Sequence, residues 1–461
     1  MKKEKRFNKQ EWSWIFYDWA NSVWYTNISA AIFPIYFAAK ATEQGNVLFG
    51  YAVSLANLIA ALAAPVLGSV GDFKGMKKKL WTIVTLIGVA FTAVMGIFGT
   101  WQMMLIGYVI SRIGISASCL FYDSFLTDVT TPDRMDKVSS WGYAMGYIGG
   151  STIPFVISIV IMLLMDMSDL SYRLAILIVP VWWTVFSIPF IMNVEQVHYV
   201  ETPPKELGRA AWKNTKETFR NIVKDKAVLF FLAAYFCYID GVDTIISMAT
   251  NFGSTLGLGT IGMILALLVT QIVAVPFSIL FGNWGRKYGA LRLIAIAVGV
   301  YAGITIVGFA MGFIVDYHEG LGLSFERACK ISTVLFWVLA TMVGTVQGGI
   351  QSLSRSYFGQ VIPPERSNEY FGFLDICGKF ACVIGPALYA FTFNVTGKPS
   401  FGILSLIILF LVALILLLLG KPHFDQAALL AAEAAAVEAP AVAELGMEAE
   451  APAEEETPAE V

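Results

Sequence analysis

Two charged side chains lie deep inside long apolar stretches of the sequence, where an ionised group costs at least a few kcal/mol. At about 1.5 Å per helical residue, Arg112 lies roughly 15 Å into one stretch and Asp240 roughly 20 Å into another. A guanidinium presents a planar set of donors that suits a carboxylate, whereas an aspartate can bind an ammonium group. Together they suit a zwitterionic solute, although either group could instead hold helices together by an ion pair or a hydrogen bond.

Further charges accompany these two at helical spacing. Asp243 follows Asp240 by three residues, so the two carboxylates would share nearly one face and could capture a proton; alternatively, Asp243 reaches the headgroups and is solvated. Lys379 lies near the middle of another apolar stretch, with Asp375 one turn earlier. This lysine could contact a solute or a coupling ion, or it could form an i, i+4 pair that neutralises both side chains.

Polar residues also gather near the ends of apolar stretches. Asp18 and Asn21 could line a pathway, or Asp18 could cap a helix start, where a negative charge suits the helix dipole. Gln347 and Gln351 could hydrogen-bond a polar ligand or hold helices together. Three more charged residues suggest a gating network between helices: Asp123, Asp128 and Arg134.

The elements that must position these side chains are membrane-spanning helices. Of the 461 residues, 57% are hydrophobic and only 14% are charged, and the mean hydropathy is +0.67. A soluble protein of this length could not keep so much apolar surface out of water, whereas a membrane protein need not. Backbone groups in lipid must be paired within the segment, and the sequence shows no short alternating strands, so we expect helices.

Twelve apolar segments are long enough to cross roughly 30 Å of hydrocarbon. They lie near residues 14–38, 46–68, 80–98, 102–125, 139–164, 171–194, 226–250, 258–281, 291–314, 329–353, 369–393 and 400–420. With the N-terminus in the cytoplasm, 24 of the 31 Lys and Arg residues fall on the cytoplasmic side, five fall on the opposite side and two fall inside spans. This bias predicts that both termini are cytoplasmic. The basic N-terminus precedes a long aromatic span, which does not resemble a cleavable signal.

The spans divide the chain into five regions. We expect an N-terminal segment (1–13), a six-helix bundle (14–194), a linker (195–225), a second six-helix bundle (226–420) and a tail (421–461). The linker is basic and amphipathic after Pro203 and Pro204, which predicts a helix on the cytoplasmic leaflet, with a plain tether as the alternative. The tail is rich in Ala, Glu and Pro, so we expect it to be disordered and cytoplasmic, with no transport chemistry.

The two bundles repeat one pattern. After the second and eighth spans come a glycine, a charged residue four positions later, a glycine three positions further on, and then basic residues. These are Gly68, Asp72, Gly75, Lys77 and Lys78 in the first half, and Gly282, Arg286, Gly289 and Arg292 in the second. A second repeat, after spans four and ten, pairs Pro132-Asp133-Arg134 with Pro364-Glu365-Arg366. The glycines permit tight turns and close helix contacts, so we expect these loops to gate the molecule.

Over spans one to twelve, this pattern resembles the major facilitator superfamily, whose signature loop matches the first-half residues above. The resemblance implies an all-α membrane fold of two pseudo-symmetric six-helix bundles, with a solute site near the midplane between halves that rock against each other. Arg286 stands where an acidic residue is commoner, so the second loop departs from the family pattern.

Four further stretches resemble the vacuole-effluxer family. They are Tyr17-Asp18-Trp19-Ala20-Asn21-Ser22, Asp240-Gly241-Val242-Asp243-Thr244, the segment 347–356, and Gly378-Lys379-Phe380. This family includes fungal autophagy-linked vacuolar proteins that export amino acids to the cytosol, and bacterial relatives. The resemblance implies amino-acid transport, and the short loops favour a bacterial member.

We therefore predict a secondary active transporter of small polar solutes, with amino acids or related zwitterions as the leading class. It would work by alternating access in a bacterial inner membrane, with proton coupling as a hypothesis. The alternatives are an exporter of amphipathic drugs or lipid-linked sugars, and a membrane scaffold or receptor. The sequence has no metal-ligand spacing, nucleophile–base set or phosphate-binding loop, so we expect no enzyme, cofactor or metal. Expected partners are a small-molecule substrate, membrane lipid and protons; no nucleic acid is expected, and the protein should be a monomer.

Overall fold

The computed structural model describes residues 6–201, 207–258 and 260–448. Pro203 and Pro204 lie outside these residues. The first half contains α1 (Lys9–Val23), the π-helix η1 (Trp24–Ala31), α2 (Ile32–Lys40), α3 (Glu43–Gly71), α4 (Met76–Ile97), α5 (Trp101–Ser124), α6 (Leu126–Val129), α7 (Pro132–Met145), the π-helix η2 (Gly146–Thr152), α8 (Ile153–Leu164) and α9 (Asp169–Asn193). The linker contains α10 (Leu207–Lys224). The second half contains α11 (Lys226–Thr255), α12 (Thr260–Tyr288), α13 (Ala290–Asp316), α14 (Phe325–Val361), the 3-10 helix η3 (Pro364–Arg366), α15 (Ser367–Thr396), α16 (Pro399–Ser405) and α17 (Ile407–Glu448).

The predicted all-α, twelve-span fold is confirmed. Within the described residues, eleven helical segments are long and apolar enough to cross a membrane. The twelfth span combines α1, η1 and α2, which follow one another without a break in the chain but are interrupted by a π-helical turn. A similar π-helical turn, η2, separates α7 from α8 in the fifth span.

The first and fifth spans pack unusually closely where α1 meets η2. A Cβ atom added at Gly149 would lie within 2.1 Å of the Trp19 ring, and one at Gly150 would lie 2.4 Å from the Ser22 side chain. At Gly146, the added atom would lie 2.8 Å from the Ser22 hydroxyl. Only glycine allows this approach, which fixes the position of α1 and therefore of Asp18.

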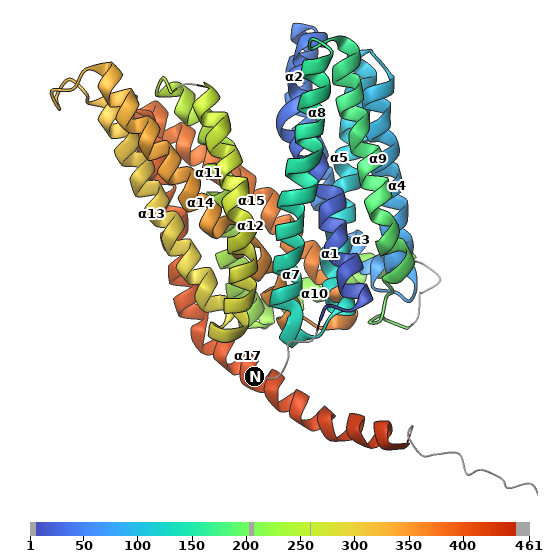
Figure 1. The fold of residues 1–461 in the computed structure, drawn as a ribbon. Helices are drawn as coiled ribbons and strands as arrows, with labels where there is room; N and C mark the ends of the chain where they lie inside the picture. The colour runs from blue at the N-terminus through green and yellow to red at the C-terminus, as the bar shows by residue number, and fades with distance from the viewer. Residues whose placement is uncertain (1–5, 202–206, 259, 449–461) are drawn as a thin grey trace, which may run out of the picture.

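The two halves meet at one end of the molecule and diverge toward the other (Figure 1). At the meeting end, α3 crosses α15 and α7 crosses α12 so closely that glycines are needed. A Cβ atom at Gly68 would lie 2.3 Å from the Asn368 carbonyl oxygen, and one at Gly282 would lie 2.6 Å from the Ser140 side chain. We call this end, which carries the loops at Asp72 and Pro363, the closed end.

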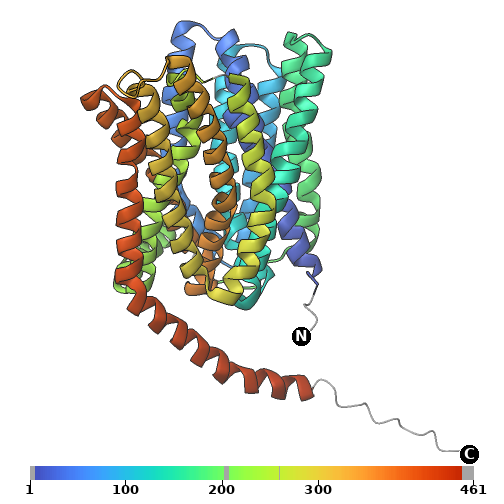
Figure 2. The same ribbon diagram turned by 60° about the vertical axis from the view of Figure 1, so that its left-hand side comes forward.

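Two features of the predicted domain organisation can be located. Helix α10 lies at the closed end, where the Thr218 hydroxyl donates to Glu369 of α15 at 2.8 Å. Helix α17 extends beyond residue 420, where we placed the end of the second bundle, and leaves the bundle as one continuous helix (Figure 2). Residues 449–461 of the predicted tail lie outside the described part of the chain.

Candidate functional site

A cavity of about 190 Å³ lies between the two halves. Five charged residues line it: Asp123, Asp243, Arg355, Asp375 and Lys379. Its remaining lining comes mainly from aromatic and aliphatic side chains of α5, α7, α11 and α15, together with Gln351 of α14. Both signs of charge therefore face one small space, as the recognition of a polar solute requires.

Arg355 closes the cavity on the side of the closed end. Its guanidinium donates to Asp123 at 2.9 Å, to Asp18 at 3.2 Å, and to the Ser139 hydroxyl and carbonyl oxygens at 2.9 and 3.0 Å. These acceptors lie on α5, α1 and α7 of the first half, whereas Arg355 belongs to α14 of the second. Only 5% of the Arg355 side chain and 11% of the Asp18 side chain are exposed, whereas Asp123 is 33% exposed toward the cavity. The network therefore joins the halves through one buried ion pair and one partly exposed pair.

Lys379 and Asp375 form an ion pair along α15, as the i, i+4 spacing allowed. Both side chains also line the cavity. Lys379 can therefore form the ion pair with Asp375 and line the cavity at the same time. A solute carboxylate that reached Lys379 would have to compete with Asp375.

The two charges that seemed deepest in the sequence lie outside this cavity lining. Arg112 donates to Asn57 of α3 at 2.9 Å and lies over the rings of Trp24 and Tyr25. Asp240 is fully buried between α11 and α15. In this conformation they do not meet, and substrate contact by either stays a prediction.

The remaining predicted polar residues are distributed over both faces of the interface. Asp18 accepts from Tyr122 at 2.8 Å in addition to Arg355, and Asn21 is buried. Gln351 lines the cavity, whereas Gln347, one turn away, is half-buried outside its lining.

Asp72 fastens the loop after α3 to the start of α15. Its carboxylate accepts from the Asn368 backbone N–H at 2.9 Å, from the Asn368 side chain at 2.7 Å and from the Glu369 backbone N–H at 3.1 Å. The first amides of a helix have no partner within the helix and carry its positive dipole end, so a carboxylate fits there. Burial raises the pKa of Asp72 to about 7. Gly75 adopts φ +70°, which a glycine tolerates without strain.

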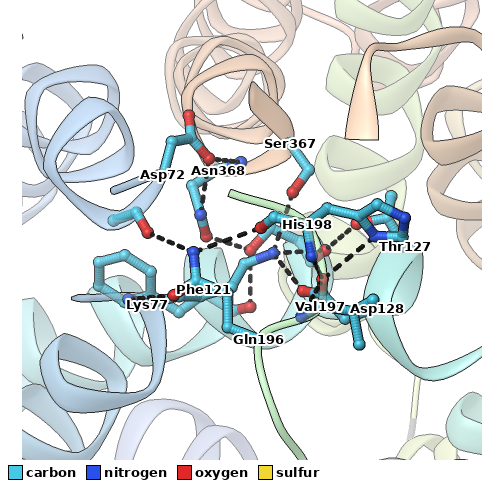
Figure 3. A network of polar contacts seen from close by, with 12 residues as sticks. Asp72, Lys77, Phe121, Thr127, Asp128, Gln196, Val197, His198, Ser367 and Asn368 are labelled. Atoms are coloured by element: carbon cyan, nitrogen blue, oxygen red, sulfur yellow. Dashed lines mark hydrogen bonds and ion pairs between the residues drawn. The ribbon is translucent and has the colours of Figure 1, made fainter. Parts of the chain in front are cut away.

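Lys77 and Asp128 form the centre of a second network at the closed end (Figure 3). The fully buried Lys77 ammonium donates to Asp128 at 2.7 Å, to the Ser124 carbonyl at 3.1 Å and, across the halves, to the Ser367 hydroxyl at 2.9 Å. The other oxygen of Asp128 accepts from the His198 backbone N–H at 2.8 Å. The linker is thereby attached to the closed end, where the α3–α4 loop also lies.

Two predicted gating residues lie beside these networks. Lys78 is half-buried, next in the chain to the fully buried Lys77. Arg134 pairs with Glu11 at 2.7 Å, which joins α7 to α1 inside the first half. The predicted gating roles of both stay predictions.

The contacts between the two halves at the closed end follow the internal repeat. Ser356 and Asn368 follow Ser124 and Asp136 by the same 232 residues. In the structure, Ser124 of α5 donates to Asn368 of α15, and Ser356 of α14 donates to Asp136 of α7 at 2.5 Å. Equivalent positions of the two halves therefore make reciprocal contacts, as a pseudo-twofold axis requires.

A family model described as vacuole effluxer Atg22 like matches residues 47–422. The chain belongs to this family. A Bacillus subtilis protein named as an uncharacterized MFS-type transporter, YxiO, is 39% identical over 427 residues, which cover 90% of this chain and 95% of that protein. Autophagy-related protein 22 of Coccidioides immitis is 27% identical over 59% of this chain and 47% of its own length, so the fungal likeness is partial.

Solved structures of major facilitator transporters share the fold of this vacuole-effluxer-like chain. A bacterial homologue of the iron transporter ferroportin, in an outward-facing state, aligns with a TM-score of 0.66 at 12% identity, over 90% of this chain and 98% of the other. The human organic anion transporter MFSD10 aligns with a TM-score of 0.65 at 12% identity, over 89% and 99%. The chain is thus a multi-pass membrane transporter of the major facilitator type.

Sequence reasoning missed three important residues of this vacuole-effluxer-like transporter. Arg355 lies in a stretch that we matched to the family, but we placed the span end at 353, so it counted as a loop residue. Lys77 was named only as one of the basic residues of the signature loop, whereas its side chain is fully buried. Asp136 lay in a segment that we assigned to a loop, whereas it accepts from Ser356 and from Gln360 at 3.0 Å.

Proposed function

We propose that this transporter carries a small zwitterionic solute, with amino acids as the leading class, through the cavity between its halves. The observation that carries the proposal is the opposed charge of the lining. Lys379 suits the solute carboxylate, whereas Asp243 suits its ammonium group. The family description, vacuole effluxer Atg22 like, supports transport without naming a solute.

The size of the cavity favours this solute class over an amphipathic drug or a lipid-linked sugar. Sites for drug-sized ligands occupy about 300–1,000 Å³ and are mostly apolar. The cavity here measures about 190 Å³, and five charged side chains line it. A compact, polar solute matches both properties.

The arrangement of the contacts at the closed end supports alternating access. In the topology that we propose, the closed end faces the cytoplasm of a bacterium and both termini lie on that side of the inner membrane. The conformation described here would then be the one open to the outside. Opening the closed end would separate Arg355 from Asp18 and Asp123, and α15 from Asp72. We further propose that protons drive the cycle.

Uptake by proteoliposomes containing the full chain tests the proposal. Radiolabelled amino-acid pools are offered with and without an imposed pH gradient, and Lys379→Met is compared with Lys330→Met. Lys330 is exposed near the start of α14, far from the closed end, and forms an i, i+4 ion pair with Glu326. It therefore controls for the loss of an ion-paired lysine. We expect Lys379→Met to raise KM at least tenfold and Lys330→Met to leave it unchanged. Equal KM values for both variants and the parent would refute the assignment of the cavity.

A further inference from the structure

Asp240 is a buried carboxylate without a cation. Its side chain is fully buried on α11, and it forms no ion pair within the described residues. One oxygen, Oδ1, accepts from the Gly385 backbone N–H of α15 at 2.9 Å, whereas Oδ2 has no hydrogen-bond partner. An ionised carboxylate in this setting costs several kcal/mol, so the position needs a reason.

A hydroxyl group completes the site. Thr244 lies one turn beyond Asp240 on α11, is 1% exposed, and its Oγ1 also lacks a partner. A Cβ atom added at Gly385 would lie 2.1 Å from Thr244 Oγ1 and 2.9 Å from Asp240 Oδ1, so the three residues enclose one point. Pro386 follows directly and has no N–H, which leaves α15 without one of its helical hydrogen bonds here.

The surroundings suit a proton better than a metal ion. A hard cation such as Mg²⁺ or Ca²⁺ needs several oxygen ligands. The Gly385 N–H beside the carboxylate is a donor and would repel such a cation. The titratable group beside Asp240 on α11 is Cys237, and Asp243 lies one turn away. From α15 comes the Gly385 N–H, and from α17 the apolar ring of Phe410 packs against Gly241. A bound proton would neutralise the carboxylate and let it donate to the nearby hydroxyl.

We propose that Asp240 Oδ2 binds the coupling proton of this transporter, at a site separate from the solute cavity. The inference rests on the proposed transport function. Helices α11 and α15, which hold the proton site, also line the cavity through Asp243 and Lys379. The Thr244 hydroxyl can donate to an ionised Asp240, but full hydration of the charge needs water, so release of the proton favours a looser α11–α15 contact. That movement reshapes the solute site and couples the two ligands.

Infrared difference spectroscopy on the purified full chain in liposomes tests the site without any solute. A protonated carboxyl group has a carbonyl stretch that disappears when it ionises. The parent for this measurement carries Asp72→Asn, which removes the carboxyl group of the closed end that is also expected to titrate. This parent should show a carbonyl band that is lost as the pH is raised. Adding Asp240→Asn should remove the band, whereas adding Asp243→Asn should retain it. Thr244→Val, which keeps the side-chain shape, should move the pH at which the band disappears. A parent band that never titrates, or that persists in Asp240→Asn, would overturn the proposal.

A flux measurement separates this inference from the proposed function. With an amino acid that the parent accumulates, Asp240→Asn should still exchange labelled for unlabelled solute at a rate within threefold of the parent. It should lose accumulation driven by a pH gradient. Accumulation by Asp240→Asn equal to that of the parent would refute the proton role. Failure of the parent to carry any amino acid would refute the proposed substrate class, while the infrared result would still decide whether Asp240 binds a proton.

Discussion

Replacing Arg355 by methionine should open the closed end of the molecule. Methionine keeps most of the side-chain length but removes every hydrogen bond to Asp18, Asp123 and Ser139. In the closed state, the largely buried Asp18 and the partly exposed Asp123 would then be left without their cation. After opening, water would hydrate both carboxylates, so the substitution would destabilise mainly the closed state.

The size of the effect follows from the burial of this network. Removing one partner of a buried ion pair costs about 3–5 kcal/mol. Because about 1.4 kcal/mol changes an equilibrium tenfold, the ratio of closed to open molecules should fall by roughly 150- to 5,000-fold. A closed end that is stabilised by a few kcal/mol in the parent would then be predominantly open.

Distances between spin labels measure this equilibrium directly. The exposed positions Thr131, just before α7, and Glu365, in η3, belong to the two different halves at the closed end and can carry the labels. Arg355→Met should shift the distance distribution to longer values, and adding Asp123→Asn should reverse part of the shift, because one unpaired charge is removed. Arg327→Met, an exposed site on the same helix, is the matched control. An unchanged distribution in Arg355→Met would show that the network does not hold the halves together.

Three further predictions concern the same end of the molecule. Between the ordinary aspartate pKa of about 4 and the value of about 7 in the closed state, closure binds a proton at Asp72, so acidification through this window should favour closure. Raising the pH should oppose it, and Asp72→Asn should abolish this dependence of the label distance. Gly68→Val should prevent closure, because its Cβ would lie 2.3 Å from a carbonyl oxygen of α15, whereas Gly50→Val, with open space around it, should not. Lys77→Met should lower the melting temperature by several degrees in a thermal-unfolding assay, while Lys78→Met should change it little.

The spans and the repeat could be predicted from the sequence because both depend on local patterns. Apolar length fixes a span, and the spacing of Gly68, Asp72 and Gly75 recurs after span eight. The left-handed backbone at Gly75 and at Gly289, with φ of +70° and +91°, explains why glycine returns at the end of each pattern. The π-helical turns could not be predicted, because they depend on contacts between spans one and five.

The candidate site was harder to predict, because depth in a helix does not reveal which way a side chain points. Arg112 and Lys379 were both placed near the midplane, yet Lys379 lines the cavity and Arg112 contacts α3. Arg355 was overlooked because we ended the tenth span at residue 353, two positions before it, where the apolar stretch gives way to polar residues. Helix α14 in fact continues to Val361, and its last two turns form the gate.

The internal repeat also explains why the gate can carry charge. Asp123 and Arg355 are 232 residues apart, the same separation as between Ser124 and Ser356, so they occupy equivalent positions in the two halves. Equivalent positions face each other near a pseudo-twofold axis, where identical charges would repel. Opposite charges at one such pair convert that repulsion into an ion pair of 2.9 Å. Because Asp123 and Arg355 also line the cavity, separating them in the proposed alternating-access cycle would open the closed end and uncover the proposed solute site in one movement.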